Sequence, residues 1–172
     1  AALLTVPPGG IVVLHACCHN PTGADLTREQ WIEVAKLVKA RGLVPFLDMA
    51  YQGFGDGLDA DAFAVRHFAS LGGPVFVSSS FSKSISLYGE RVGALSVVTD
   101  SADEAARTLS QLKRVIRTNY SNPPTHGGQV VAMVLGSAAL RALWEQELAG
   151  MRDRIRVMRE QLAGKLKARL PA

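Results

Sequence analysis

Short apolar runs rich in β-branched residues alternate along this chain with longer segments that have helical periodicity. The runs are predicted to be buried strands at residues 11–15, 43–48, 75–79 and 92–98. Strands that alternate with helices are typical of an α/β domain, in which helices flank a mostly parallel sheet. We expect that fold class, because 172 residues are enough to bury a sizeable core.

The segments between the runs carry helix signals at their ends. Thr27 and Gln30 fit a capping box and Gly42 fits a C-cap, so a helix is predicted over 27–41. A stretch rich in Gly and Asp at 53–60 is predicted to be a loop. Further helices are predicted at 61–71, 101–117, 126–135 and 138–170.

The last predicted helix is unusually long for a globular protein. Its apolar stripe consists of Leu140, Trp144, Leu148, Met151, Ile155, Met158, Leu162 and Leu166. We interpret 1–136 as part of a large domain and 137–172 as a long helix that leads toward a small domain absent from this sequence. Pairing with another helix in heptad fashion is the alternative. The unmatched stripe indicates a fragment of a longer protein.

Charge and cysteine content exclude several classes of partner. Lys plus Arg is 19 and Asp plus Glu is 15, a net charge of +4, and no basic patch is interleaved with aromatic residues, so no nucleic-acid partner is expected. No apolar stretch approaches the length of a membrane span, and no signal peptide is visible. Cys17 and Cys18 fit reduced thiols of a cytoplasmic protein. Together with His19 they have the wrong spacing for zinc, so no metal site is expected.

Lys83 follows the third apolar run in the sequence Ser79-Ser80-Phe81-Ser82-Lys83, and Arg91 comes eight residues later. An amine held at the end of a buried strand can form a Schiff base with an aldehyde and can also move protons as a tethered base. A surface lysine in a loop is the simpler interpretation of this motif on its own.

Polar residues also follow the first two predicted strands. Asp48 ends an otherwise apolar run, and ligands of open α/β sheets bind at the carboxyl ends of strands. A carboxylate there can pair with a pyridinium, while Tyr51, three residues on, can reach a ring oxygen. Asn20 can donate its amide to the same oxygen. A capping Asp, a packed Tyr and a simple Asn-Pro turn are the alternatives.

Two arginines and a serine complete the pattern. Ser80 and Arg91 are candidate phosphate ligands, because arginine makes forked, charge-assisted bonds to phosphate. Arg117 is a candidate clamp for a substrate carboxylate, or else an ordinary cation at the end of a helix. Amine, acid, ring-oxygen donors and phosphate donors together meet the requirements of pyridoxal phosphate, which works as an electron sink.

The order and spacing of these motifs resemble those of the class I aspartate and aromatic amino-acid aminotransferases. The resemblance covers essentially the whole chain and rests on the segments His19-Asn20-Pro21-Thr22-Gly23, Asp48-Met49-Ala50-Tyr51, Ser79-Ser80-Phe81-Ser82-Lys83, Glu90-Arg91-Val92-Gly93 and Tyr120-Ser121-Asn122-Pro123-Pro124. It implies fold type I of the enzymes that use pyridoxal phosphate, a homodimer with sites at the interface, and ping-pong transamination between amino acids and 2-oxo acids.

The same resemblance implies a role for each candidate residue. Lys83 would form the aldimine with pyridoxal phosphate and would be catalytic together with Tyr51 and Asp48. The cofactor would be held by Asn20, Asp48, Tyr51, Ser80, Lys83 and Arg91. Asn20 and Arg117 would bind the substrate, and Arg117 would reach the distal carboxylate of a dicarboxylate in the neighbouring subunit's site.

Parts of the family pattern cannot be placed in this sequence, namely the Gly-rich phosphate loop, the stacked aromatic residue, the tyrosine that crosses to the other subunit and the arginine of the small domain. The isolated chain is therefore expected to be inactive. The motifs look closest to bacterial members that act on aromatic amino acids and on aspartate or glutamate. Another fold type I enzyme, such as a lyase or synthase, and a non-enzymatic domain that binds pyridoxal phosphate for regulation are the alternatives.

Overall fold

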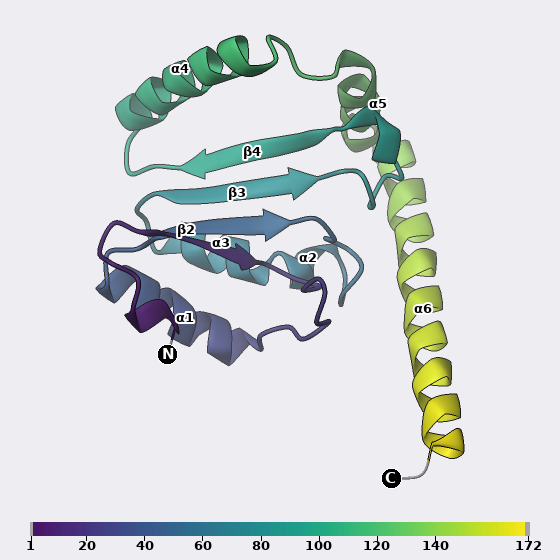
Figure 1. Cartoon of the computed structure of the whole chain (residues 1–172). Coiled ribbons are helices and arrows are strands. Elements are labelled where there is room, and N and C mark those ends of the chain that lie inside the picture. The colour runs from purple at the N-terminus through teal and green to yellow at the C-terminus, as the bar shows by residue number, and fades with distance from the viewer. Residues whose placement is uncertain (1, 171–172) are drawn as a thin grey trace.

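A computed structural model describes residues 2–170 of the chain. Its centre is a four-stranded sheet in the spatial order β1 (Ile11–His15), β2 (Val44–Met49), β3 (Val75–Ser80) and β4 (Gly93–Val98). β1, β2 and β3 are parallel, and β4 runs antiparallel to β3 (Figure 1). The predicted α/β class with a mostly parallel sheet is confirmed.

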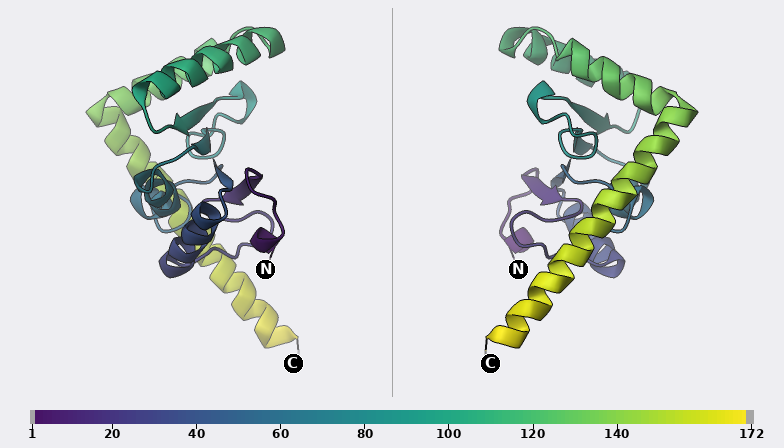
Figure 2. Two further views of the ribbon diagram at one scale, coloured as in Figure 1. Left: turned by 90° about the vertical axis from the view of Figure 1, so that its left-hand side faces the viewer. Right: turned by 90° about the vertical axis from the view of Figure 1, so that its right-hand side faces the viewer.

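Helices surround this sheet unevenly. They are α1 (Arg28–Ala40), α2 (Leu58–Asp61), α3 (Phe63–Ser70), α4 (Ala102–Asn119), α5 (Thr125–Gly136) and α6 (Ala138–Arg169), with short 3-10 helices at Ala2–Leu4 and Tyr88–Glu90. α1 and α3 lie together below the sheet, whereas α4 lies beyond β4 at the opposite end of the molecule (Figures 1 and 2). α6 passes along the side at which the parallel strands end (Figure 1).

α1 forms where the sequence predicts a helix. The Thr27 hydroxyl accepts the backbone N–H of Gln30 at 3.3 Å, and the Gln30 side chain accepts the backbone N–H of Thr27 at 2.9 Å. This reciprocal pair is the predicted capping box. Arg41 is the C-cap, and Gly42 follows it with a φ of +63°. The C-cap is therefore one residue earlier than predicted, and Gly42 takes the position directly after it, where a left-handed residue is favoured.

The region after β2 differs from its prediction. α2 begins at Leu58, so the last part of the predicted loop 53–60 is wrong, and Ala62 separates α2 from α3, which confirms the short helix predicted at 61–71 within the bounds Phe63–Ser70. The physical reason for the difference is Asp61, whose buried carboxylate accepts three backbone N–H groups of the preceding loop. Those bonds fold the loop back onto the end of α2, and the sequence pattern gives no sign of them.

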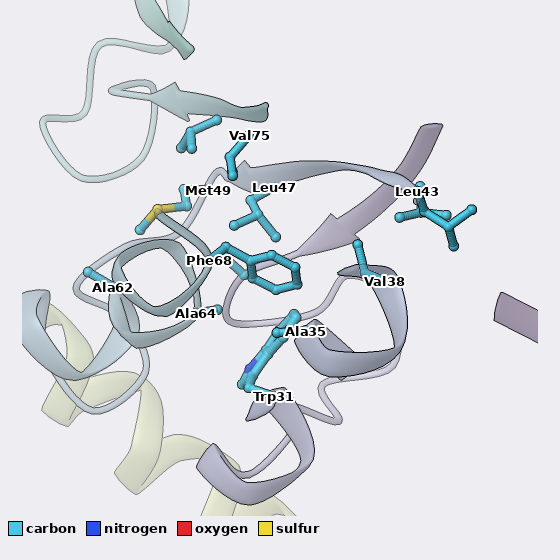
Figure 3. Close-up of a cluster of buried hydrophobic side chains, with 13 residues drawn as sticks. Trp31, Ala35, Val38, Leu43, Leu47, Met49, Ala62, Ala64, Phe68 and Val75 are labelled. Atoms are coloured by element: carbon cyan, nitrogen blue, oxygen red, sulfur yellow. The ribbon is translucent and has the colours of Figure 1, made fainter. Parts of the chain in front are cut away.

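The core lies between one face of the sheet and the helices α1 and α3. Figure 3 shows Trp31 and Phe68 from these two helices close to Leu47 of β2. The two aromatic rings meet edge to face with 6.3 Å between their centroids, an arrangement that aromatic pairs favour. On the opposite face, Ile11 and Val13 are 63% and 65% exposed. The described residues therefore bury one face of the sheet much more fully than the other.

The apolar stripe predicted on the last helix is mostly uncovered. Leu148 is buried, and Trp144 and Met151 are half-buried. The other members of the stripe are at least 40% exposed: Leu140, Ile155, Met158, Leu162 and Leu166. Long helices gain most of their stability by packing an apolar face, so this stripe marks a surface on which the described residues place nothing.

α5 and α6 meet at Ser137, whose side chain accepts the N–H of Leu140 and caps α6. The two helices bend by 99° at this break. Among residues 2–170, no single helix is both long and apolar enough to cross a membrane. α5 and α6 meet the length and composition requirements only when taken as this bent pair.

Candidate active site

The parallel strands β1, β2 and β3 end at one edge of the sheet, and the loops that follow them carry Asn20, Tyr51 and Lys83. Ligands of open α/β sheets bind in the crevice outside the carboxyl ends of the strands. The strand register places His15, Asp48 and Ser78 side by side at this edge.

Asp48 is oriented by side chains from both neighbouring strands. The Ser78 hydroxyl donates to Oδ1 of Asp48 at 2.6 Å, and Nε2 of His15 lies 4.0 Å from Oδ2. The backbone N–H of Asn20 donates to Nδ1 of His15 at 3.3 Å. Because Nδ1 is an acceptor there, neutral His15 carries its proton on Nε2, which faces Asp48. The carboxylate keeps free lone pairs for a further donor.

Three of the predicted site residues meet beside Asp48. The amide Nδ2 of Asn20 lies 3.4 Å from the hydroxyl of Tyr51, so the two polar groups point at a shared position. Nζ of Lys83 lies 4.8 Å from the centroid of the Tyr51 ring, within the range of a cation–π contact. Side chains from three separate loops are thus brought together as the sequence predicts.

A cavity of about 770 Å³ opens at this position. Tyr51, Lys83 and Tyr88 line it from the sheet side, and Arg152 and Arg156 line it from α6. Small-molecule sites of proteins have volumes of roughly 300 to 1,000 Å³. The cavity is therefore large enough for a cofactor-sized ligand, and its α6 wall is rich in positive charge.

α6 lies against the three loops that carry Asn20, Tyr51 and Lys83. The indole N–H of Trp144 donates to the carbonyl oxygen of Ser84 at 2.6 Å, next to Lys83. Leu148 packs against Gly53 with no room for a side chain there, and Arg152 donates to the carbonyl oxygen of Gly53 at 3.3 Å. Arg159 of α6 lies close to Gly23 in the loop of Asn20, because a Cβ added at Gly23 would be 3.4 Å from Nη2 of Arg159.

The candidate phosphate ligands lie at the same edge but bind local partners. The Ser80 hydroxyl accepts the N–H of Ser82 at 3.2 Å, and the Arg91 guanidinium donates to the carbonyl oxygen of Tyr88 at 3.1 Å. Ser80 pairs with Gly93 across β3 and β4, so the backbone of Arg91 runs beside the loop of Lys83. Neither side chain lines the 770 Å³ cavity.

Arg117 lies away from this cavity. It occupies the last turn of α4 and donates to the hydroxyl of Ser121. It is not among the residues that line the cavity. A role in a neighbouring subunit's site, as the resemblance implies, therefore stays a prediction.

Sequence analysis did not identify His15 and Ser78 as site residues. Both were treated only as parts of strands, although each is a polar residue at the carboxyl end of a strand next to β2. That signal could have identified them, because polar residues aligned with Asp48 across parallel strands share its face.

The whole chain, residues 1–172, matches the family model described as aminotransferase class I and II. An aspartate aminotransferase of Pseudomonas aeruginosa is 68% identical over 165 residues, covering 94% of this chain and 42% of the relative. An aromatic-amino-acid aminotransferase of Escherichia coli is 56% identical over 171 residues, covering 99% of this chain and 43% of the relative.

A crystal structure of an aromatic-amino-acid aminotransferase from Burkholderia pseudomallei, covalently bound to pyridoxal phosphate, superposes with a TM-score of 0.95. The two are 71% identical, and the match covers 97% of this chain and 42% of that one. The chain spans about two fifths of the length of each of these relatives. With a family model that matches all of its residues and relatives more than half identical, this chain belongs to the class I and II aminotransferases.

Proposed function

We propose that this chain is the central part of an aminotransferase that uses pyridoxal phosphate to move an amino group between an amino acid and a 2-oxo acid. The observation that carries the proposal is that Tyr51 and Lys83 line one cavity, with the Asn20 amide 3.4 Å from the Tyr51 hydroxyl. The pyridoxal phosphate of the relative that is 71% identical supports the same cofactor here. Because the chain spans about two fifths of its relatives, the activity is proposed for the protein that contains it.

The residues present fit the chemistry of pyridoxal phosphate. An amine, Lys83, is available for the aldehyde, and the Tyr51 hydroxyl and Asn20 amide are available for the ring oxygen. Asp48 binds one hydroxyl donor, that of Ser78, and has lone pairs left for a protonated ring nitrogen. The cavity beside these groups has room for the ring.

Each residue then has a defined task. The bound cofactor supplies an electron sink for the charge that develops on the substrate carbon. The Lys83 amine moves a proton at that carbon as a tethered general base. The Asp48 carboxylate, oriented by Ser78 and His15, holds a proton on the ring nitrogen. Tyr51 and Asn20 donate hydrogen bonds to the ring oxygen.

Ser80 and Arg91 are proposed phosphate ligands. Both lie at the edge where β3 ends, and arginine makes forked, charge-assisted bonds to phosphate. In the same account, 1–136 is the part of the large domain that binds pyridoxal phosphate, and 137–172 is a long helix leading to a small domain. The break at Ser137 and the exposed stripe of α6 support this division.

The substrates are proposed to be aromatic amino acids, aspartate or glutamate, and the matching 2-oxo acids. The names of the relatives support this range, because they include aspartate, aromatic-amino-acid and tyrosine aminotransferases. Asn20 and Arg117 are proposed to bind the substrate. Since Arg117 does not line the cavity of its own chain, we assign it to the site of a second subunit in a homodimer. A cytoplasmic location is proposed from the two free cysteines.

Replacement of Lys83 tests the proposal. Lys83→Ala in the complete protein should abolish transamination of aspartate and tyrosine, whereas Lys36→Ala, at an exposed position of α1, should leave the rate unchanged. Retained turnover in the Lys83→Ala variant would show that the assignment is wrong. The 172-residue chain alone should have little or no turnover, because the cavity lacks the family parts that the sequence does not contain.

A single exposure to amino acid separates the alternatives. A transaminase keeps the amino group on the cofactor as pyridoxamine phosphate, which is measured after denaturation. A lyase or synthase returns the cofactor unchanged and releases a product. A regulatory domain binds pyridoxal phosphate and produces neither. Only the first result agrees with the proposed function.

A further inference from the structure

A second cluster of reactive side chains lies next to Tyr51, outside the set assigned to the cofactor. Cys17 and Cys18 come shortly after β1, and Asp61 is the last residue of α2. One atom from each, the two Sγ atoms and a carboxylate oxygen, all lie within 4.8 Å of one another. Cys17 and Asp61 are buried, whereas Cys18 is half-buried and lines the 770 Å³ cavity.

The backbone brings the two thiols to the same side. Successive side chains of an extended strand point to opposite faces. Cys18 instead has a φ of +52°, a left-handed conformation that is uncommon outside glycine. Its Sγ lies 3.8 Å from the carbonyl oxygen of Tyr51 and within 4.8 Å of the Sγ of Cys17. Adjacent cysteines therefore present both sulfur atoms to one point.

The charges around this point are negative. The Asp61 carboxylate lies within 4.8 Å of both sulfur atoms, and Asp25 accepts the backbone N–H of Cys18 at 2.8 Å. The charged side chains that act on both thiols are acidic, and such surroundings favour a bound cation.

Asp61 is already held in place. Its Oδ2 accepts the N–H groups of Gly53 at 2.7 Å and Gly55 at 3.1 Å, and its Oδ1 accepts the N–H of Asp56 at 2.8 Å. A carboxylate offers about four lone-pair positions, so one remains after these three bonds. The oxygen ligand thus keeps its position without help from a metal.

We propose that Cys17, Cys18 and Asp61 bind one thiophilic divalent cation of the class of Zn²⁺ and Cd²⁺. Thiolate sulfur and carboxylate oxygen are accepted ligands of Zn²⁺, and three protein ligands leave a fourth position open. Cys18 also lines the cavity, so an ion held by it would be open to solvent or ligand from that side. His19 is not part of this cluster, and its Nδ1 is hydrogen-bonded with the hydroxyl of Thr22 at 2.7 Å.

Cadmium titration of the purified, reduced, metal-free protein tests this site. The ultraviolet charge-transfer band of cadmium thiolates reports how many sulfur atoms bind the ion. We expect one ion per chain with the band of two thiolates. Cys17→Ala and Cys18→Ala should each halve the band and weaken binding by roughly 100-fold, the upper end of what loss of a supporting residue causes.

Three further variants make the result decisive. The double variant C17A/C18A measures any signal from thiols elsewhere in the protein. Asp61→Asn keeps both thiolates, so it should lower the affinity and leave the band per bound ion unchanged. His19→Ala is the matched control and should bind as the wild type does. Circular dichroism checks each fold, and Cys18→Ala, at a half-buried position, should disturb the fold least.

The proposal is overturned by any of three results. The first is the absence of a thiolate band in the wild-type protein. The second is wild-type affinity in the Cys18→Ala variant. The third is loss of binding in His19→Ala, which would assign the ion to a different ligand set. None of these results depends on aminotransferase activity.

Discussion

In the core between the sheet and the helices α1 and α3, side chains such as Leu47 are completely buried, whereas α6 buries Leu148 and leaves most of its apolar stripe in solvent. The candidate site lies between these two regions. Asp48 and its partners His15 and Ser78 sit on strands of the buried core, while one wall of the cavity belongs to α6. The position of Asp48, the proposed partner of the ring nitrogen, is thus set by the sheet, whereas the α6 wall is held by a few contacts.

Truncating a leucine should have very different effects on stability in the two regions, and this is the largest difference we expect. Leu47→Ala removes a completely buried side chain and should lower the free energy of unfolding by roughly 2 to 5 kcal/mol. Leu162→Ala, at a position 60% exposed, should change it by less than about 0.5 kcal/mol. Denaturant unfolding monitored by circular dichroism measures both. A Leu162→Ala cost as large as that of Leu47→Ala would show that the stripe of α6 is buried in solution.

Gly53 should have the next largest effect, because it joins the two regions. Gly53 has a φ of +95°, and an added Cβ would overlap Cδ2 of Leu148. Gly53→Ala should therefore cost roughly 1 to 3 kcal/mol, the usual range for overpacking. Gly164→Ala, in the open part of α6, should instead stabilise the helix by roughly 0.5 to 1 kcal/mol. Equal effects of the two changes would contradict the contact between α6 and the loop of Tyr51.

Trp144→Phe tests whether the hydrogen bond from α6 to Ser84 orders the loop of Lys83. The variant loses the indole N–H and leaves the carbonyl oxygen of Ser84 without its donor, at a cost of roughly 1 kcal/mol. Hydrogen exchange of the Ile85 and Ser86 amides, which bond within this loop, should become faster. The Ala16 amide, bonded to Asp48 in the core, should keep its rate. Unchanged exchange at Ile85 would show that α6 does not order this loop.

The smallest difference should come from the helix caps. Thr27→Ala removes the cap of α1 and should cost roughly 1 kcal/mol of global stability. Ser137→Ala removes the cap of α6, yet global stability should change by less than about 0.5 kcal/mol, because an exposed helix end opens locally. Denaturant midpoints measure the first effect, and exchange of the Leu140 amide measures the second. A larger loss of global stability from Ser137→Ala than from Thr27→Ala would show that α6, rather than α1, is the more firmly packed helix.

Local signals in the sequence were enough for the parts of the fold that depend on neighbouring residues. The capping box of Thr27 and the left-handed position at Gly42 define α1 almost to the residue. The positions of Asn20, Tyr51 and Lys83 near one another follow from their places after parallel strands. Family resemblance added the roles of these residues, which no single motif supplies.

Features that depend on distant contacts were not predictable. Asp61 ends α2 because it bonds to a loop whose conformation no local pattern encodes. The polar character of His15 and Ser78 at strand ends is visible in the sequence, but their contacts with Asp48 depend on the register of three strands. Periodicity shows that α6 has an apolar stripe, yet it cannot show that Leu148 is the member that becomes buried.

The central claim is that the loops after the parallel strands assemble a cofactor site around Lys83. The most direct measurement is to incubate the protein with pyridoxal phosphate, reduce with borohydride and locate the adduct by peptide mass, with Lys83→Ala as the control. The account predicts one adduct, on Lys83, that disappears in the variant. No adduct, or adducts spread equally over exposed lysines such as Lys36, would contradict it.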